Sequence, residues 1–146
     1  MLVRRLTMAQ ALVEWLCAQR IHTESGDKRL FPGVFGIFGH GNVTCLAEAL
    51  ERVQDDMPTW RGQNEQGMAL AGVAYAKAKR GEQIMVATSS LGPGATSMVT
   101  SAAVAMANRL PLLLLSGDTF VNRRPDPVLQ QVEHFGDPTV TVNDCF

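Results

Sequence analysis

An excess of charge of one sign is the first thing this 146-residue sequence lacks. Its 13 lysines and arginines meet 14 aspartates and glutamates, for a formal net charge of −1. Nucleic acids and anionic membranes attract strongly basic surfaces, so this balance argues against both as partners. With 18% charged and 46% hydrophobic residues, the chain is also too apolar for a disordered protein.

Cysteines and long apolar runs are scarce as well. Cys17, Cys45 and Cys145 are widely spaced, with no C-x-x-C pair and no histidine placed to complete a zinc site. The longest apolar run, residues 110–115, has the length of a strand, well short of the ~20 residues of a membrane span. Polar residues interrupt the apolar part of the N-terminal segment, which no signal-peptide cleavage site follows. We therefore expect ordinary thiols, no metal ligands and a cytoplasmic globular domain.

Short apolar segments alternate with amphipathic ones along the chain. Thr7 is a good cap for a first helix, and the spacing predicts further helices over 43–53, 65–80 and 95–108 and near 128–134. Strands are expected at 34–38, 59–60, 84–88, 111–115 and 139–142, with a polar loop at 22–33. Because the strands are in general apolar rather than alternating, as in a parallel sheet covered by helices on both faces, we predict a three-layer α/β/α domain with a mainly parallel central sheet.

Four unusual loops follow the predicted strands. They read GHGN (39–42), GQNEQG (62–67), SSLGPGA (89–95) and SGDT (116–119). In parallel α/β folds, ligands bind beyond the carboxyl ends of the strands. The four loops are therefore expected to line one edge of the sheet together and to form the functional site.

Glu65 lies in the first turn of the predicted 65–80 helix, where a carboxylate is often only a dipole partner. This helix, however, is rich in small and apolar residues nearly all round. Such a helix should be buried, and a buried carboxylate is costly without a partner. We expect Glu65 to meet a specific donor.

Two of the loops carry further candidates. His40 stands between two glycines and could carry a proton or bind a substrate, although a surface histidine fits the same pattern. The 89–94 loop precedes a helix, so its amides could cradle an anion or simply form a tight turn. Its spacing is neither G-x-G-x-x-G nor a Walker loop, so it gives no support for nucleotide phosphate binding.

Together these segments resemble the pyrimidine-binding (PYR) domain of thiamine-diphosphate enzymes of the acetolactate synthase group. The resemblance extends over nearly the whole chain in order and spacing, and it is carried by NEQGMA (64–69), GVAYA (72–76), TSSLGPGAT (88–96) and NRLPL (108–112). Within the group, FGHGN, RGQNEQGMA and GDTFVNRRPDPVLQQVEH look like a member that hydrolyses a C–C bond of a cyclic dione in inositol catabolism. One departure is Asn64, where the group usually has a histidine.

The resemblance implies a role for each candidate. A glutamate at the position of Glu65 hydrogen-bonds N1′ of the cofactor's aminopyrimidine and promotes loss of the thiazolium C2 proton. Gly92 and Gly94 shape the loop beside the pyrimidine, and Gln130 matches a glutamine near the reacting centre. His40, a candidate catalytic residue, and Asn42 lie in the loop that faces the substrate in relatives.

The resemblance also implies partners outside this chain. Members of the group hold the cofactor's diphosphate and Mg²⁺ on a separate domain through a G-D-G…N motif, which Gly117-Asp118-Thr119 does not match. We therefore expect residues 1–146 to be an N-terminal PYR domain, a fragment that is inactive alone and that pairs with a diphosphate domain in a homodimer or larger oligomer. Two alternatives stay open: another thiamine enzyme, such as an acetolactate-synthase-like lyase or a subunit of a split decarboxylase, and a non-catalytic α/β binding module.

Overall fold

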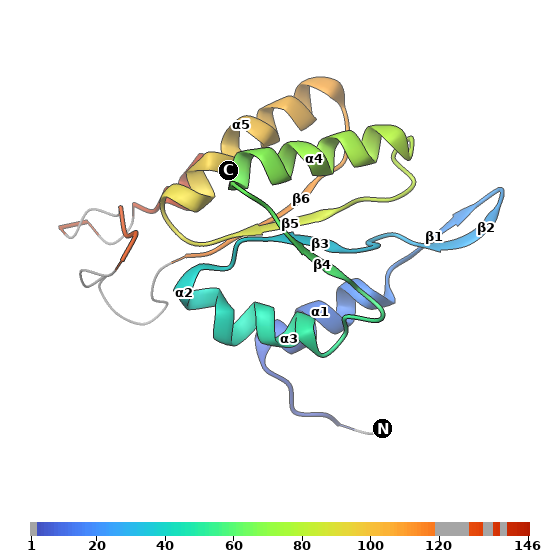
Figure 1. The fold of residues 1–146 in the computed structure, drawn as a ribbon, viewed down its shortest axis with the longest axis horizontal. Coiled ribbons are helices and arrows are strands. Elements are labelled where there is room, and N and C mark those ends of the chain that lie inside the picture. The colour runs from blue at the N-terminus through green and yellow to red at the C-terminus, as the bar shows by residue number, and fades with distance from the viewer. Residues whose placement is uncertain (1–2, 119–128, 133–135, 138–139) are drawn as a thin grey trace.

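A parallel four-stranded sheet forms the centre of the molecule (Figure 1). The computed structural model describes residues 3–118, 129–132, 136–137 and 140–146. The strand order is β4-β3-β5-β6, and all three neighbouring pairs are parallel. The elements are α1 (Met8–Ala18), β1 (Arg20–Thr23), β2 (Gly26–Arg29), β3 (Val34–Gly36), α2 (Gly39–Asn42), the π-helical turn η1 (Val43–Ala47), α3 (Glu48–Glu51), β4 (Thr59–Arg61), α4 (Glu65–Ala78), β5 (Val86–Ser89), α5 (Pro93–Asn108), β6 (Leu113–Ser116) and the 3₁₀ turn η2 (Val142–Cys145).

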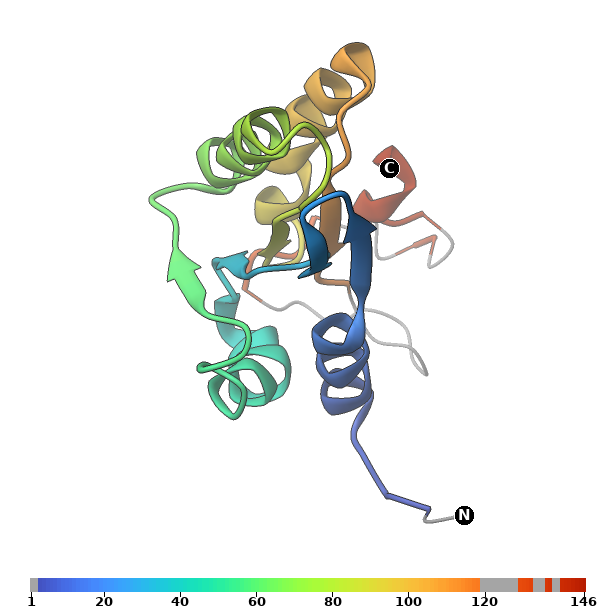
Figure 2. The same ribbon diagram turned by 90° about the vertical axis from the view of Figure 1, so that its right-hand side faces the viewer.

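Helices cover both faces of the sheet, which confirms the predicted three-layer class (Figures 1 and 2). On one face, α1, η1 and α3 enclose a buried cluster whose members are Val13, Leu16, Phe31, Val34, Leu46, Ala49, Leu50, Met57 and Val86. On the other, α4 and α5 pack together over a smaller cluster of Met68, Ala69, Ala87 and Met98. The inner strand β5 is buried at all four positions, including the polar Thr88 and Ser89, as expected for a strand covered by helices on both faces.

Local signals set where the helices begin and end. Thr7 forms a capping box with Gln10 at the start of α1, and the Asn64 side chain accepts a hydrogen bond from the Gly67 amide at the start of α4. After α4, Arg80 and Gly81 take positive φ angles of 55° and 78°, which end the helix as the glycine at 81 predicts. No helix in the described part of the chain is long and apolar enough to cross a membrane.

The prediction of a loop over residues 22–33 is wrong for residues 22–29 and holds for residues 30–33, which have no helix or strand. Residues 20–29 form the antiparallel hairpin β1–β2, in which Arg20 pairs with Arg29 and Thr23 with Gly26. Its strands can be polar because the hairpin extends from the side of the domain (Figure 1) and none of its strand residues is buried. It is tied to the domain through Lys28, whose Nζ lies 2.8 Å from Glu82 Oε2.

Two predictions near the C-terminus also need correction. Of the expected helix near 128–134, residues 129–132 are described and have no helical structure, while residues 128 and 133–134 lie outside the described residues. The expected strand at 139–142 is absent from the described residues 140–142. There the Thr141 side chain accepts a hydrogen bond from the Asn143 amide and starts the 3₁₀ turn η2.

Candidate functional site

The loop after β3 is pressed against the loop after β5. Gly39 has φ +60°, and a Cβ built there would lie 2.3 Å from Ser90 Oγ, so only glycine fits without displacing that serine. Three residues further on, Asn42 Nδ2 donates to the Ser89 carbonyl oxygen at 3.2 Å. The GHGN and SSLGPGA loops therefore meet, as their places after neighbouring strands predict.

Gln130 contacts the 89–95 loop through both its side chain and its backbone. Its Oε1 accepts a hydrogen bond of 3.0 Å from the hydroxyl of Ser90, which is only 3% exposed. A Cβ at Gly92, whose φ is +63°, would lie 1.9 Å from the Gln130 carbonyl oxygen. Gln130 itself has φ +68°, so its backbone as well as its side chain is fitted to this loop.

Glu65 reaches the same loop from α4. The Oε1 of its half-buried side chain lies 2.8 Å from where a Cβ on Gly94 would be, and that Cβ would also be 3.5 Å from Ser90 Cβ. The carboxylate thus lies beside the first turn of α5, with the Ser90 side chain on the same side. Glu65 is half-buried rather than buried as expected, and among the described residues nothing donates a hydrogen bond to its carboxylate, so the expected donor stays a prediction.

The loop after β6 completes the contact between loops. The Gly117 amide donates to the Ser89 carbonyl at 3.2 Å, and a Cβ on Gly117 would lie 2.8 Å from the Leu91 amide nitrogen. Asn143 Nδ2 donates in turn to the Gly117 carbonyl oxygen at 3.2 Å. The loops after β3, β5 and β6 and the start of α4 therefore come together at the carboxyl edge of the sheet, as the sequence predicts.

His40 is the least constrained of the predicted site residues. It is exposed at the start of α2, and its ring makes no hydrogen bond within the described part of the chain. Gly92, Gly94, Gln130 and Glu65 are linked through Ser90 and the first turn of α5, whereas no described contact joins His40 to them. His40 is thus free to meet a ligand from solvent.

The described residues offer no clustered metal ligands. No group of three or more histidine, cysteine, aspartate or glutamate side chains lies close enough together there to hold a metal ion. Burial raises the pKa of the Cys17 thiol on α1, and Cys45 and Cys145 are free and exposed. No described disulfide or metal site uses these three thiols.

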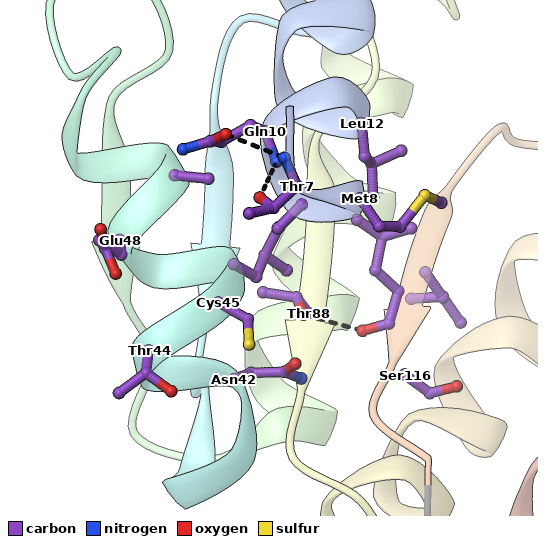
Figure 3. A pocket seen from close by; sticks show the side chains of 15 residues that line it. Thr7, Met8, Gln10, Leu12, Asn42, Thr44, Cys45, Glu48, Thr88 and Ser116 are labelled. Carbon is purple, nitrogen blue, oxygen red and sulfur yellow. Dashed lines mark hydrogen bonds between the residues drawn. The ribbon is translucent and has the colours of Figure 1, made fainter. Parts of the chain in front are cut away.

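A cavity of about 600 Å³ opens on the face of the sheet opposite α4 and α5. It lies between α1, η1 and the strands β5 and β6 (Figure 3). Cys45, Asn42 and Thr88 point toward it in the close-up. Glu65, Gly92, Gly94 and Gln130 do not line it. Asn42 therefore touches both regions, because its amide binds the Ser89 carbonyl at the edge between them.

Two serines that form hydrogen bonds between distant segments were not among the site residues predicted from the sequence. Ser90 holds Gln130, and Ser101, which is fully buried in α5, donates to the Gln66 carbonyl oxygen at 3.0 Å and joins α5 to the start of α4. Each bond joins residues far apart in the sequence. The only signal available was the position of Ser90 in a loop already marked as unusual.

The fold and these loops define a cofactor-binding domain of thiamine-dependent enzymes. The family described as thiamine pyrophosphate enzyme, N-terminal TPP binding domain, matches residues 6–137. The chain belongs to this family.

The similar proteins point to one member of the family. The chain is 54% identical over 142 residues to 3D-(3,5/4)-trihydroxycyclohexane-1,2-dione hydrolase of Geobacillus thermodenitrificans. It is 51% identical over the same length to 3D-(3,5/4)-trihydroxycyclohexane-1,2-dione hydrolase 2 of Bacillus cereus. Each match covers 97% of this chain and 22% of the relative, so the chain spans about a fifth of the length of these curated relatives.

Proposed function

We propose that this chain is the N-terminal, aminopyrimidine-binding domain of a thiamine-diphosphate-dependent hydrolase that cleaves a C–C bond of trihydroxycyclohexane-1,2-dione. The observation that carries the proposal is the meeting of Glu65 with the 89–95 loop, in a chain 54% identical to a hydrolase of that name. Ring opening by net addition of water would give a deoxy-hexuronate.

The residues present fit the proposed cofactor. An aminopyrimidine ring is flat and has nitrogen atoms at its rim, so a carboxylate at one edge and backbone without side chains beside the ring would suit it. Glu65 supplies the carboxylate, and Gly94 leaves open the space that a Cβ would fill 2.8 Å from Oε1. The absence of any described donor to that carboxylate leaves it able to accept a hydrogen bond from a ligand.

Each site residue has a distinct proposed task. Bound thiamine diphosphate would supply an acidic C–H group and act as an electron sink for C–C cleavage. Glu65 would hold or exchange a proton at its carboxylate facing the aminopyrimidine ring, while Gly92 and Gly94 keep the adjacent backbone close. Gln130 would lie at the border of the cofactor site. In the loop after β3, His40 and Asn42 Oδ1, which accepts no hydrogen bond from the described residues, are the proposed contacts for the dione, with His40 as proton carrier.

The remaining parts of the enzyme are proposed to lie outside this chain. We place Mg²⁺ and the diphosphate on a separate domain and expect the chain to be inactive alone, because Gly117-Asp118-Thr119 does not match the G-D-G…N motif that holds them in the group the chain resembles. We also propose a homodimer or larger assembly, because α4 exposes a row of small residues that a second copy could cover: Gly67, Ala71 and Ala74.

Replacing the carboxyl group of Glu65 tests the function directly. In the full-length protein that contains this chain, Glu65→Gln keeps the size of the side chain but removes the group that exchanges a proton. General acid–base contributions of this kind are about 10²–10⁴-fold. Turnover of the dione and exchange of the cofactor's C2 proton for deuterium, followed by NMR, should both fall by that factor. The fold should be unchanged.

A matched variant separates this role from a general loss of charge. Glu51→Gln removes an exposed carboxylate from α3, on the opposite face of the sheet, and should leave both rates near those of the wild type. If Glu65→Gln exchanges the C2 proton at the wild-type rate, Glu65 has no part in the chemistry. If the wild-type protein neither binds thiamine diphosphate nor consumes the dione, the proposed function itself is wrong.

A further inference from the structure

Ser90 occupies a central position in the loop cluster. It is the first residue after β5, is 3% exposed, and its Oγ lies 3.0 Å from Gln130 Oε1. Its Cβ and the Glu65 carboxylate both lie against Gly94, within 3.5 Å of where a Cβ on that glycine would be. Ser90 therefore lies between the two polar side chains that the proposed cofactor site needs.

Two glycines leave the space that this arrangement requires. A Cβ on Gly39 would lie 2.3 Å from Ser90 Oγ and displace the hydroxyl. A Cβ on Gly92 would collide with the carbonyl oxygen of Gln130. The Ser90 hydroxyl and the Gln130 backbone are thus each packed against a glycine, which limits the positions open to the two partners of the hydrogen bond.

The hydrogen bond also decides which end of the Gln130 amide is available. A glutamine side chain offers one carbonyl acceptor and an NH₂ group with two donors. Because Oε1 accepts from Ser90, the NH₂ group stays free of partners within the described residues. Gln130 can therefore present a donor to an acceptor atom of a ligand.

We propose that Ser90 is a positioning residue that fixes the Gln130 amide with its NH₂ group toward the ligand bound beside Glu65. The inference rests on the proposed function for the identity of that ligand, a cofactor or substrate with an acceptor nitrogen or oxygen. Ser90 does not touch the reacting atoms. It acts through Gln130.

The first test examines the contact without cofactor or turnover. Hydrogen–deuterium exchange, read by mass spectrometry on the cofactor-free full-length protein, should show faster exchange in peptides containing residues 129–132 when Ser90 is changed to alanine. Ser101→Ala is the matched control, because Ser101 is also buried and donates one 3.0 Å hydrogen bond to another element. It should leave exchange at 129–132 unchanged. Equal exchange there in Ser90→Ala and wild type would overturn the proposal.

The second test measures coupling between the two residues. Calorimetric titration with thiamine diphosphate and Mg²⁺ gives the dissociation constant of the wild type, Ser90→Ala, Gln130→Ala and the double variant. Loss of one hydrogen bond should weaken binding about 3- to 10-fold in each single variant. If Ser90 acts through Gln130, the double variant should be no weaker than the weaker single variant. If the fold losses of affinity in the two single variants multiply in the double variant, Ser90 and Gln130 act independently and the proposal is overturned.

A third variant tests which end of the amide matters. Gln130→Glu keeps an oxygen that can accept from Ser90 but removes the NH₂ donor. Cofactor affinity or the Michaelis constant for the dione should suffer as much as in Gln130→Ala, while exchange at 129–132 stays slow. Wild-type affinity and Michaelis constant in Gln130→Glu would show that no donor is presented.

These outcomes are separate from those of the proposed function. Were thiamine diphosphate not bound by the wild type, the proposed function would fail, and the exchange experiment would still judge the contact between Ser90 and Gln130. Conversely, a strong effect of Glu65→Gln with no effect of Ser90→Ala on exchange would leave the function intact and reject this inference.

Discussion

The N-termini of α4 and α5 lie side by side but are built in opposite ways. At α4, the Asn64 side chain caps the helix by accepting a 2.6 Å hydrogen bond from the Gly67 amide. At α5, the capping position is Gly92, with φ +63°, and no side chain caps the first turn. Pro93 follows, and its ring removes one amide donor.

The difference separates a structural helix start from one left available for binding. At the α4 start, the Asn64 side chain satisfies the Gly67 amide, and the Glu65 carboxylate lies toward the first turn of α5. The α5 start relies on close backbone contact with Gln130 and on the carboxylate of Glu65 beside Gly94. A helix start without a side-chain cap can give its amides to a ligand. The uncapped start of α5 is therefore the one placed at the centre of the proposed site.

The largest effect on stability should come from Gly92→Ala. A side chain there must adopt a left-handed backbone conformation and also displaces the Gln130 carbonyl. Strain and overpacking together should lower the free energy of unfolding by about 2–4 kcal/mol. Urea denaturation, followed by the fluorescence of Trp15 and Trp60, measures the change.

Gly41→Ala is the control for that substitution. Nothing lies within 4 Å of a Cβ built at Gly41, which sits in the helical turn α2. Alanine there should be neutral or stabilise the chain by about 0.5–1 kcal/mol. Similar losses from both substitutions would mean that contact with Gln130 does not constrain Gly92.

A smaller loss is expected from removing the cap of α4. Asn64→Ala leaves the Gly67 amide without its 2.6 Å partner and should cost about 1 kcal/mol of unfolding free energy. Asn64→Ser or Asn64→Asp, which also cap helices, should restore most of it. An unchanged denaturation midpoint in Asn64→Ala would show that the two helix starts do not differ in the way described.

The smallest stability effect should come from Glu65→Gln. It removes a negative charge from the first turn of α4 and from beside the first turn of α5. Helix-dipole interactions of exposed or half-buried carboxylates are worth about 0.3–1 kcal/mol, and salt screens them. The difference from wild type in denaturation should therefore shrink between low and high salt. A loss well above that of Asn64→Ala would assign Glu65 a structural role.

The regular part of the fold follows from the sequence because its signals are local. Runs such as 84–88 and 111–115 are mostly apolar and predict parallel strands, which the structure places at β5 and β6 within two residues. Of these, β5 is buried and β6 half-buried. The stripe of Val43, Leu46, Leu50 and Val53 predicts a helix, and the structure has one there. It begins at Gly39 and includes the π-helical turn η1, whose extra residue per turn leaves no mark in a pattern of four apolar positions.

The hairpin shows what local signals miss. Ile21 is the one apolar residue in β1, and β2 has none, so no alternation of apolar and polar residues marks either strand. The pairing is stabilised from outside the hairpin, where Gln83 Nε2 donates to the Arg29 carbonyl oxygen at 2.9 Å and Lys28 meets Glu82. Such contacts depend on the folded arrangement of distant segments and cannot be read from residues 20–29.

The candidate site was predicted as a meeting of loops but not as a set of contacts. The rule that parallel strands present their carboxyl ends at one edge is enough to bring the loops at 39–42, 89–95 and 116–118 together. It does not say that Ser90 would donate to Gln130 or that Asn42 would use its amide on a backbone carbonyl. Those bonds depend on side-chain geometry at ångström scale, and no pattern of residue types fixes that. The roles proposed for His40, Asn42, Glu65, Gly92, Gly94 and Gln130 stay predictions.

The sequence separation across these contacts sets when the site can form. Asn42 and Ser89 are 47 residues apart, and Ser90 and Gln130 are 40 apart, whereas the β1–β2 hairpin closes over a short turn. Hairpins form in about 1–10 μs, while pairings between distant segments are slow because the intervening chain must first be ordered. During synthesis on a ribosome, the two strands of the hairpin can begin to pair early, although their contacts with Glu82 and Gln83 form only after those residues have been made. The loop around Ser90 must wait, without its partner, until Gln130 has been made.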